Sequence, residues 1–143
     1  MLVAMTTAFV AEETIAQPLD RVWRVLTDWD NAHRWMNGID RLSAAGPNAP
    51  GTQLTFHTRG KDRGAEIVEY EEGRRIVLRS AQGNVTADYR YEVRPSGDGR
   101  THVTLTADCE IRGWLSMFGA LLRFVIRRTD GDQLSALRDA VER

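Results

Sequence analysis

The sequence predicts an α+β fold in which a curved antiparallel sheet of about six to seven strands wraps around a long C-terminal helix. Residues 85–93 and 101–111 alternate between apolar and polar side chains, as expected for strands with one buried and one solvated face. Turns that contain glycine precede both segments. Farther along, residues 114–126 carry Arg123 as their only charge, so this helix is apolar on more sides than packing on a sheet requires. An internal cavity, a membrane interface or a partner protein would each cover the excess apolar surface.

Length and charge limit the classes of protein to which the chain can belong. Its 143 residues fit a single domain over residues 1–143, and 19 positive residues nearly balance 20 negative ones, which argues against nucleic acid as a partner. The single cysteine, Cys109, excludes an internal disulfide and a multi-thiolate zinc site. The N-terminal residues lack the positive charge of a signal peptide, and residues 114–126 are too few to span a bilayer. We therefore expect a cytoplasmic protein without a transmembrane segment.

Two short helices are expected after the first strand, which covers residues 9–15. Pro18 opens the first helix, in which Leu19, Val22, Trp23 and Leu26 recur at helical spacing. A second helix, capped by Asp28 or Asp30, continues through Trp35 and closes at Asn37-Gly38.

The other strands are expected near residues 39–44, 52–58, 65–70 and 75–80. In the strand at residues 85–93, the alternation places Tyr89 and Tyr91 on the buried face. Its solvated face is expected to carry Thr86, Asp88, Arg90 and Glu92. The C-terminal helix begins near Leu115 and includes Leu137 and Val141 on its apolar side. One long helix is expected, and Gly131 is the position that permits a bend or break, because glycine costs about 1 kcal/mol relative to alanine inside a helix.

The order of these elements resembles that of the START-like (SRPBCC) helix-grip superfamily, which includes polyketide cyclases, dehydrases and lipid-transfer proteins. The motifs that carry the resemblance are Ile15-Ala16-Gln17-Pro18, Val22-Trp23, Leu26, Asp28, Trp35, Gly51-Thr52, Thr101-x-Val103-x-Leu105 and the terminal helix. The resemblance spans about residues 7–142. It implies that the sheet grips the C-terminal helix and encloses a pocket for an apolar or aromatic small molecule. None of the motifs selects a particular reaction.

Residues from the short-helix segment, the inward sides of the strands and the C-terminal helix are expected to line this pocket. They are Trp35, Met36, Leu54, Phe56, Leu78, Tyr89, Tyr91, Phe118, Leu122 and Ile126. Ordinary core packing is the alternative role for most of them.

Three ionisable side chains are candidates for proton transfer. Tyr89 and Tyr91 can present phenol groups to a ligand, and Glu13 shares the parity of the apolar residues of the first strand. A rim position is the simpler interpretation of Glu13, because an unpaired glutamate is rarely buried.

No metal or cofactor site is predicted. His57 and His102 fall on solvated faces, and His33 has no carboxylate or thiol arranged with it. The acidic pairs Asp28-Trp29-Asp30 and Asp130-Gly131-Asp132 lack the longer ligand series of a calcium loop.

These observations favour a protein that binds a small hydrophobic or aromatic ligand, lipid-like or polyketide-like, in an internal cavity. A cyclase or dehydratase that uses the same cavity is the second hypothesis. The third is an interaction module that exposes Trp114, Met117 and Leu121 to a partner or to a second copy in a homodimer.

Overall fold

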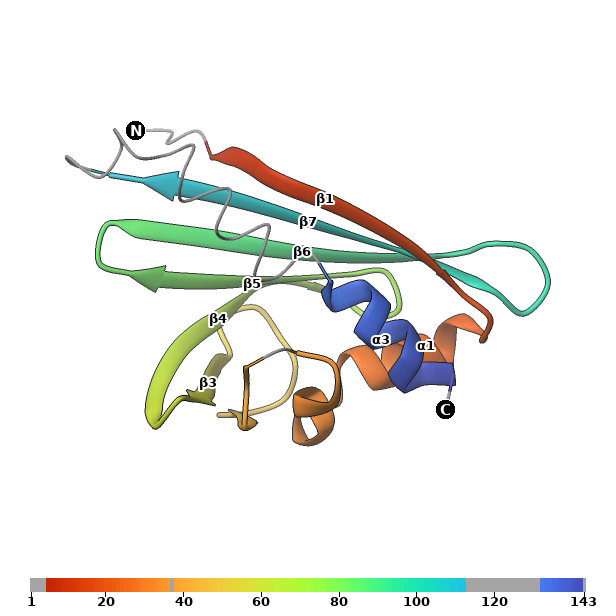
Figure 1. Ribbon diagram of the computed structural model, residues 1–143, viewed down its shortest axis with the longest axis horizontal. Helices are drawn as coiled ribbons and strands as arrows, with labels where there is room; N and C mark the ends of the chain where they lie inside the picture. The colour runs from red at the N-terminus through yellow and green to blue at the C-terminus, as the bar shows by residue number, and fades with distance from the viewer. Residues whose placement is uncertain (1–4, 37, 113–131, 143) are drawn as a thin grey trace.

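The computed structural model describes residues 5–36, 38–112 and 132–142. Within them, seven strands form one antiparallel sheet in the order β1-β7-β6-β5-β4-β3-β2. The strands are β1 (Thr6–Ile15), β2 (Arg41–Ala44), β3 (Gln53–Thr58), β4 (Lys61–Glu71), β5 (Arg75–Gln82), β6 (Val85–Pro95) and β7 (Thr101–Ile111). The sheet curves around the helices (Figure 1), which confirms the predicted α+β architecture. Strands β2 to β7 follow one another as a meander, and β1 closes the order beside β7.

Strand β4 begins at Lys61, four residues before the predicted strand at residues 65–70. The reason is a tight two-residue turn, in which Arg59 and Gly60 have φ values of +52° and +77°. Two consecutive positive φ values match the right-handed twist of the flanking strands, so pairing starts at once between Thr58 and Lys61. The polar residues 61–64 therefore belong to a strand and not to a loop.

The predicted register of β6 is confirmed. Tyr91 is 2% exposed in the core, whereas Asp88 and Arg90 on the opposite face form ion pairs with neighbouring strands. Thr86 departs from the expectation, because this solvated-face residue is only 9% exposed where it pairs with Ala81 and Glu110.

Helix α1 (Leu19–Leu26) follows β1 and buries Val22, Trp23 and Leu26, as predicted. Pro18 is its N-cap residue, in an extended conformation that ends the strand and turns the chain.

The second short helix is a 3₁₀ helix, η1 (Trp29–Arg34). The prediction that an aspartate side chain caps it is wrong. Asp28 occupies the cap position but makes no capping hydrogen bond. Its carboxylate instead accepts a hydrogen bond of 2.7 Å from the side-chain amide of Asn31. This bond links two side chains three residues apart, which is the spacing of one turn of a 3₁₀ helix.

Helix α3 (Gln133–Glu142) lies in the C-terminal segment that was predicted to be helical. Leu134, Leu137 and Val141 are buried at spacings of three and four, so one stripe of the helix faces the core. It contacts β1 and α1, and Figure 1 shows α1 and α3 side by side beneath one end of the sheet. Leu115, where the helix was expected to begin, and Gly131, the position that permits a bend or break, lie outside the described residues.

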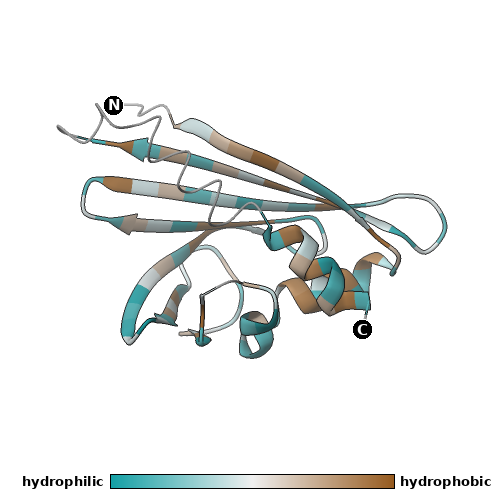
Figure 2. Ribbon diagram, viewed as in Figure 1, coloured by the Kyte–Doolittle hydropathy of each residue, from teal (hydrophilic) through white to brown (hydrophobic). Residues whose placement is uncertain are grey.

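The core fills the space between the concave face of the sheet and the helices, where Figure 2 shows apolar segments on both sides. Ile15, Leu105 and Leu137 from three different elements are fully buried there. None of the helices in the described part of the chain is long and apolar enough to cross a bilayer.

Candidate ligand-binding cavity

A cavity of about 300 Å³ lies on the concave side of the sheet, between strands β3 to β6, the segment after η1 and the start of α3. Its described lining residues are Met36, Ile39, Phe56, Thr58, Arg63, Ala65, Leu78, Ser80, Gln82, Tyr89, Tyr91 and Gln133.

Strand alternation explains why these side chains share one wall. Phe56 on β3 is paired with Arg63 on β4, and Leu78 on β5 is paired with Tyr89 on β6. Successive residues of a strand point to opposite faces, so every second residue of each strand reaches the concave side. The wall therefore combines residues that are far apart in the sequence.

The structure brings five of the predicted lining residues to the cavity: Met36, Phe56, Leu78, Tyr89 and Tyr91. Trp35 and Leu54 are each 1% exposed and are not among the lining residues. Trp35 packs behind the wall, with its ring edge-on to Tyr91 at a centroid distance of 5.9 Å. Phe118, Leu122 and Ile126 lie outside the described residues.

Gln133 is a wall residue that the sequence reasoning missed. The hydroxyl of Tyr91 donates a buried hydrogen bond of 2.6 Å to Oε1 of Gln133, which joins β6 to the first residue of α3. Gln133 occupies the same helical stripe as the fully buried Leu137, one turn away. A polar residue on an otherwise apolar stripe was the signal that could have found it.

Arg63 and Gln82 were also missed. The guanidinium of Arg63 donates a hydrogen bond to Oε1 of Gln82, which links β4 to β5 at the cavity wall. Arg63 lies in the polar segment that was not recognised as a strand, so its inward parity could not be assigned.

Glu13 is not among the described lining residues of the cavity. Its carboxylate forms an ion pair with Arg138 of α3, and its side chain is 20% exposed. The charge and hydrogen bond of Glu13 raise the pKa of the Arg138 guanidinium above its ordinary value. Glu13 therefore ties β1 to α3, and of the three proton-transfer candidates only the two tyrosines reach the cavity.

The histidines lie away from the cavity wall. His57 Nδ1 is 2.7 Å from Oδ1 of Asp62, and His102 lies beside Thr14 and Glu12 on the solvated face of the sheet. His33 is exposed on η1. Within the described residues, no group of three or more histidine, cysteine, aspartate or glutamate side chains is placed to hold a metal ion.

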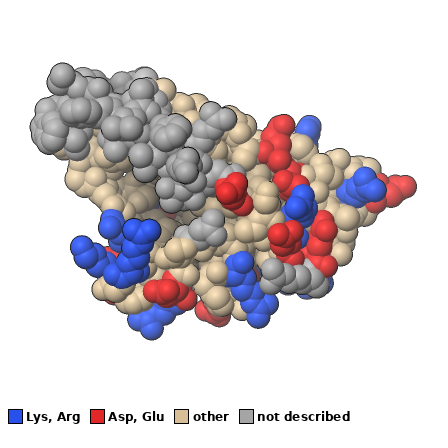
Figure 3. Space-filling model, in the orientation of Figure 1, with Lys and Arg blue, Asp and Glu red and all other residues tan. Residues whose placement is uncertain are grey.

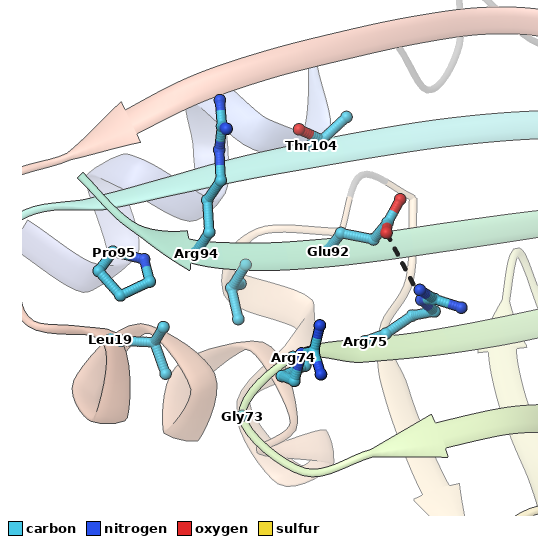
Figure 4. Close-up of a pocket in the computed structure, with 9 residues that line it drawn as sticks. Leu19, Gly73, Arg74, Arg75, Glu92, Arg94, Pro95 and Thr104 are labelled. Atoms are coloured by element: carbon cyan, nitrogen blue, oxygen red, sulfur yellow. Dashed lines mark ion pairs between the residues drawn. The ribbon is translucent and has the colours of Figure 1, made fainter.

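A larger depression of about 540 Å³ lies near the turn between β4 and β5, and four of its lining residues are charged. Figure 4 shows Arg75 in an ion pair with Glu92, at 3.4 Å, while Arg94 extends away from that pair. Arg74 in turn pairs with Glu71 at 3.1 Å. Since two of its three arginines are already neutralised by carboxylates and it lacks aromatic walls, this surface is a weaker candidate than the concave cavity.

Solved structures match the chain over nearly its full length. The Zhui aromatase/cyclase from Streptomyces sp. R1128 superposes with a TM-score of 0.78 at 19% identity, over 98% of this chain and 95% of that chain. A START superfamily protein from Mycobacterium smegmatis gives 0.75 at 17% identity, over 94% and 96%. Truncated norcoclaurine synthase from Thalictrum flavum gives 0.68 at 16% identity, over 99% and 94%. At these identities the likeness establishes a shared helix-grip fold.

No curated protein matches the chain. The family model described as polyketide cyclase / dehydrase and lipid transport matches residues 6–142, which include every strand and helix of the structure. The resemblance seen in the sequence is thereby confirmed, and the chain belongs to the polyketide cyclase / dehydrase and lipid transport family.

Proposed function

We propose that this protein binds a small apolar or aromatic molecule in the concave cavity. The observation that carries the proposal is a space of about 300 Å³ walled by Met36, Phe56, Leu78 and the two tyrosines. The cavity opens to solvent and its lining also includes polar groups, so water or a ligand is the expected occupant.

Binding is favoured over cyclisation or dehydration by the chemistry of the wall. The described lining residues include no carboxylate and no imidazole, and Glu13 is paired with Arg138. Tyrosine hydroxyls alone make a weak acid and base pair near neutral pH, because their ordinary pKa is about 10. The third hypothesis, protein contact through Trp114, Met117 and Leu121, concerns residues outside the described part of the chain.

Native mass spectrometry of freshly purified protein tests the proposal directly. We expect a fraction of the protein to carry a small molecule that is lost on denaturation. Apolar compounds added to the emptied protein should raise its melting temperature, since they bind only the folded state. Failure of both measurements would contradict the proposal.

A pair of variants on β5 separates cavity filling from general destabilisation. Ser80 lines the cavity, whereas its neighbour Ala81 is exposed on the other face of the same strand. Ser80→Phe should occupy the cavity and abolish the ligand-induced rise in melting temperature. Ala81→Phe should retain that rise, because its ring points to solvent. An equal response in both variants would place the ligand elsewhere.

A further inference from the structure

The cavity wall is uneven in charge. Arg63 is the only charged residue among its described lining residues, and it lies in the first half of β4, exposed to solvent at the rim of the cavity. Farther along the wall, the polar pair Tyr91 and Gln133 is neutral and hydrogen-bonded. Met36, Phe56 and Leu78 supply apolar wall surface. The cavity thus combines one cationic group with a mostly neutral lining.

The guanidinium of Arg63 has more N–H donors than its hydrogen bond to Gln82 uses. One of its nitrogens donates to Gln82, and no carboxylate of the described residues forms an ion pair with it. An arginine side chain carries five N–H groups, so the bond to Gln82 orients the planar group and leaves donors for a ligand.

The surroundings of Arg63 strengthen its positive potential. Lys61 has the same parity on β4 and is exposed, and Arg59 is exposed in the adjoining turn. Asp62, which lies between Lys61 and Arg63 in the sequence, has the opposite parity and pairs with His57. Figure 3 shows basic side chains gathered over this β3–β4 hairpin.

We propose that the ligand is an amphipathic carboxylic acid whose apolar or aromatic body fills the cavity and whose carboxylate is held by Arg63. This inference rests on the proposed function, because it names the chemical class of the molecule bound at the same site. A carboxylate accepts two parallel N–H bonds from one guanidinium, a geometry that an amide or an alcohol cannot reproduce with equal strength. A cationic ligand would be repelled.

The volume guides the choice of a probe. The cavity has a volume of about 300 Å³ and opens to solvent, so it can hold an aromatic ring system while a polar group remains at its rim. A bicyclic aromatic acid is compact and rigid, which makes it a suitable probe.

The test compares 2-naphthoate with its neutral analogue 2-naphthamide by isothermal titration calorimetry. We expect the wild type to bind the acid about tenfold or more tightly than the amide, as a charge-assisted hydrogen bond provides. Arg63→Gln should reduce that preference to within about twofold while it leaves the affinity for the amide unchanged. Arg59 is exposed like Arg63 but is not among the cavity-lining residues, so Arg59→Gln removes the same charge and should keep most of the preference.

The outcomes distinguish the two proposals. If the acid and the amide bind the wild type equally, the cavity binds ligands but the assignment of a carboxylic acid is wrong. A preference that persists in Arg63→Gln, or that disappears equally in Arg59→Gln, would also overturn the role of Arg63. If neither compound binds and no apolar compound raises the melting temperature, the proposed function itself fails. Circular dichroism and the retained affinity for the amide show whether Arg63→Gln is folded.

Discussion

The hydroxyl of Tyr91 donates a hydrogen bond of 2.6 Å to Oε1 of Gln133, and this bond joins the middle of β6 to the first residue of α3. The two residues are only 2% and 8% exposed, so water competes little for either group. Both also line the cavity. The bond therefore holds the start of the terminal helix against the sheet at the place where the ligand is expected to bind.

Removing the Tyr91 hydroxyl should destabilise the fold. Tyr91→Phe leaves the buried oxygen of Gln133 without this donor, which costs about 1 to 3 kcal/mol of unfolding free energy. Urea denaturation measures the change. In the double variant Tyr91→Phe with Gln133→Leu, both polar groups are gone, and much of the loss should be recovered. Strictly additive losses would contradict the importance of this bond.

Helix α3 should depend on Leu137 for its attachment. This side chain is fully buried, so Leu137→Ala removes apolar contacts and leaves a cavity, at a cost of about 2 to 5 kcal/mol. Ser135 is exposed on the same helix, and Ser135→Ala should change the unfolding free energy by less than about 0.5 kcal/mol. Thermal and urea unfolding of both variants provide the comparison. Similar small effects would mean that α3 contributes little to the stability of the domain.

The ion pair between Arg79 and Asp88 on the solvated face should contribute modestly. Two hydrogen bonds of 2.7 and 2.8 Å join them and raise the pKa of the arginine. Because Arg79 is 46% exposed, solvent screening limits the coupling energy to about 0.5 to 1 kcal/mol at low salt. A double-mutant cycle with Arg79→Gln and Asp88→Asn measures it. The coupling should fall as ionic strength rises, and a salt-independent value would contradict a screened surface pair.

Glu13 should be dispensable for ligand binding. Its carboxylate pairs with Arg138 and is not among the described residues that line the cavity. Glu13→Gln is therefore expected to leave the affinity for an apolar ligand unchanged, in contrast to Ser80→Phe. Calorimetric titration of both variants with the same compound tests this. Loss of binding in Glu13→Gln would revive the interpretation of Glu13 as an inward acid.

Short-range patterns were sufficient to predict most of the sheet. The period-two alternation in β6 and β7 specified their buried faces, because a shift of one residue would expose Tyr91 and bury Arg90. Spacings of three to four residues predicted Leu137 and Val141 as buried residues of the terminal helix. Each of these features depends on a residue and its near neighbours in the chain, so the sequence alone determined it.

Tertiary structure decided which inward residues belong to the cavity. Leu54 and Phe56 have the same parity on β3, yet only Phe56 reaches the cavity, while Leu54 lies in the core. Glu13 could be assigned to a face, but its partner Arg138 is 125 residues away. Arg63 lies in the wall because the tight turn at Arg59-Gly60 starts β4 earlier than predicted. Alternation determines the face on which a side chain lies, whereas its depth and its partners depend on elements that fold onto that face from distant parts of the chain.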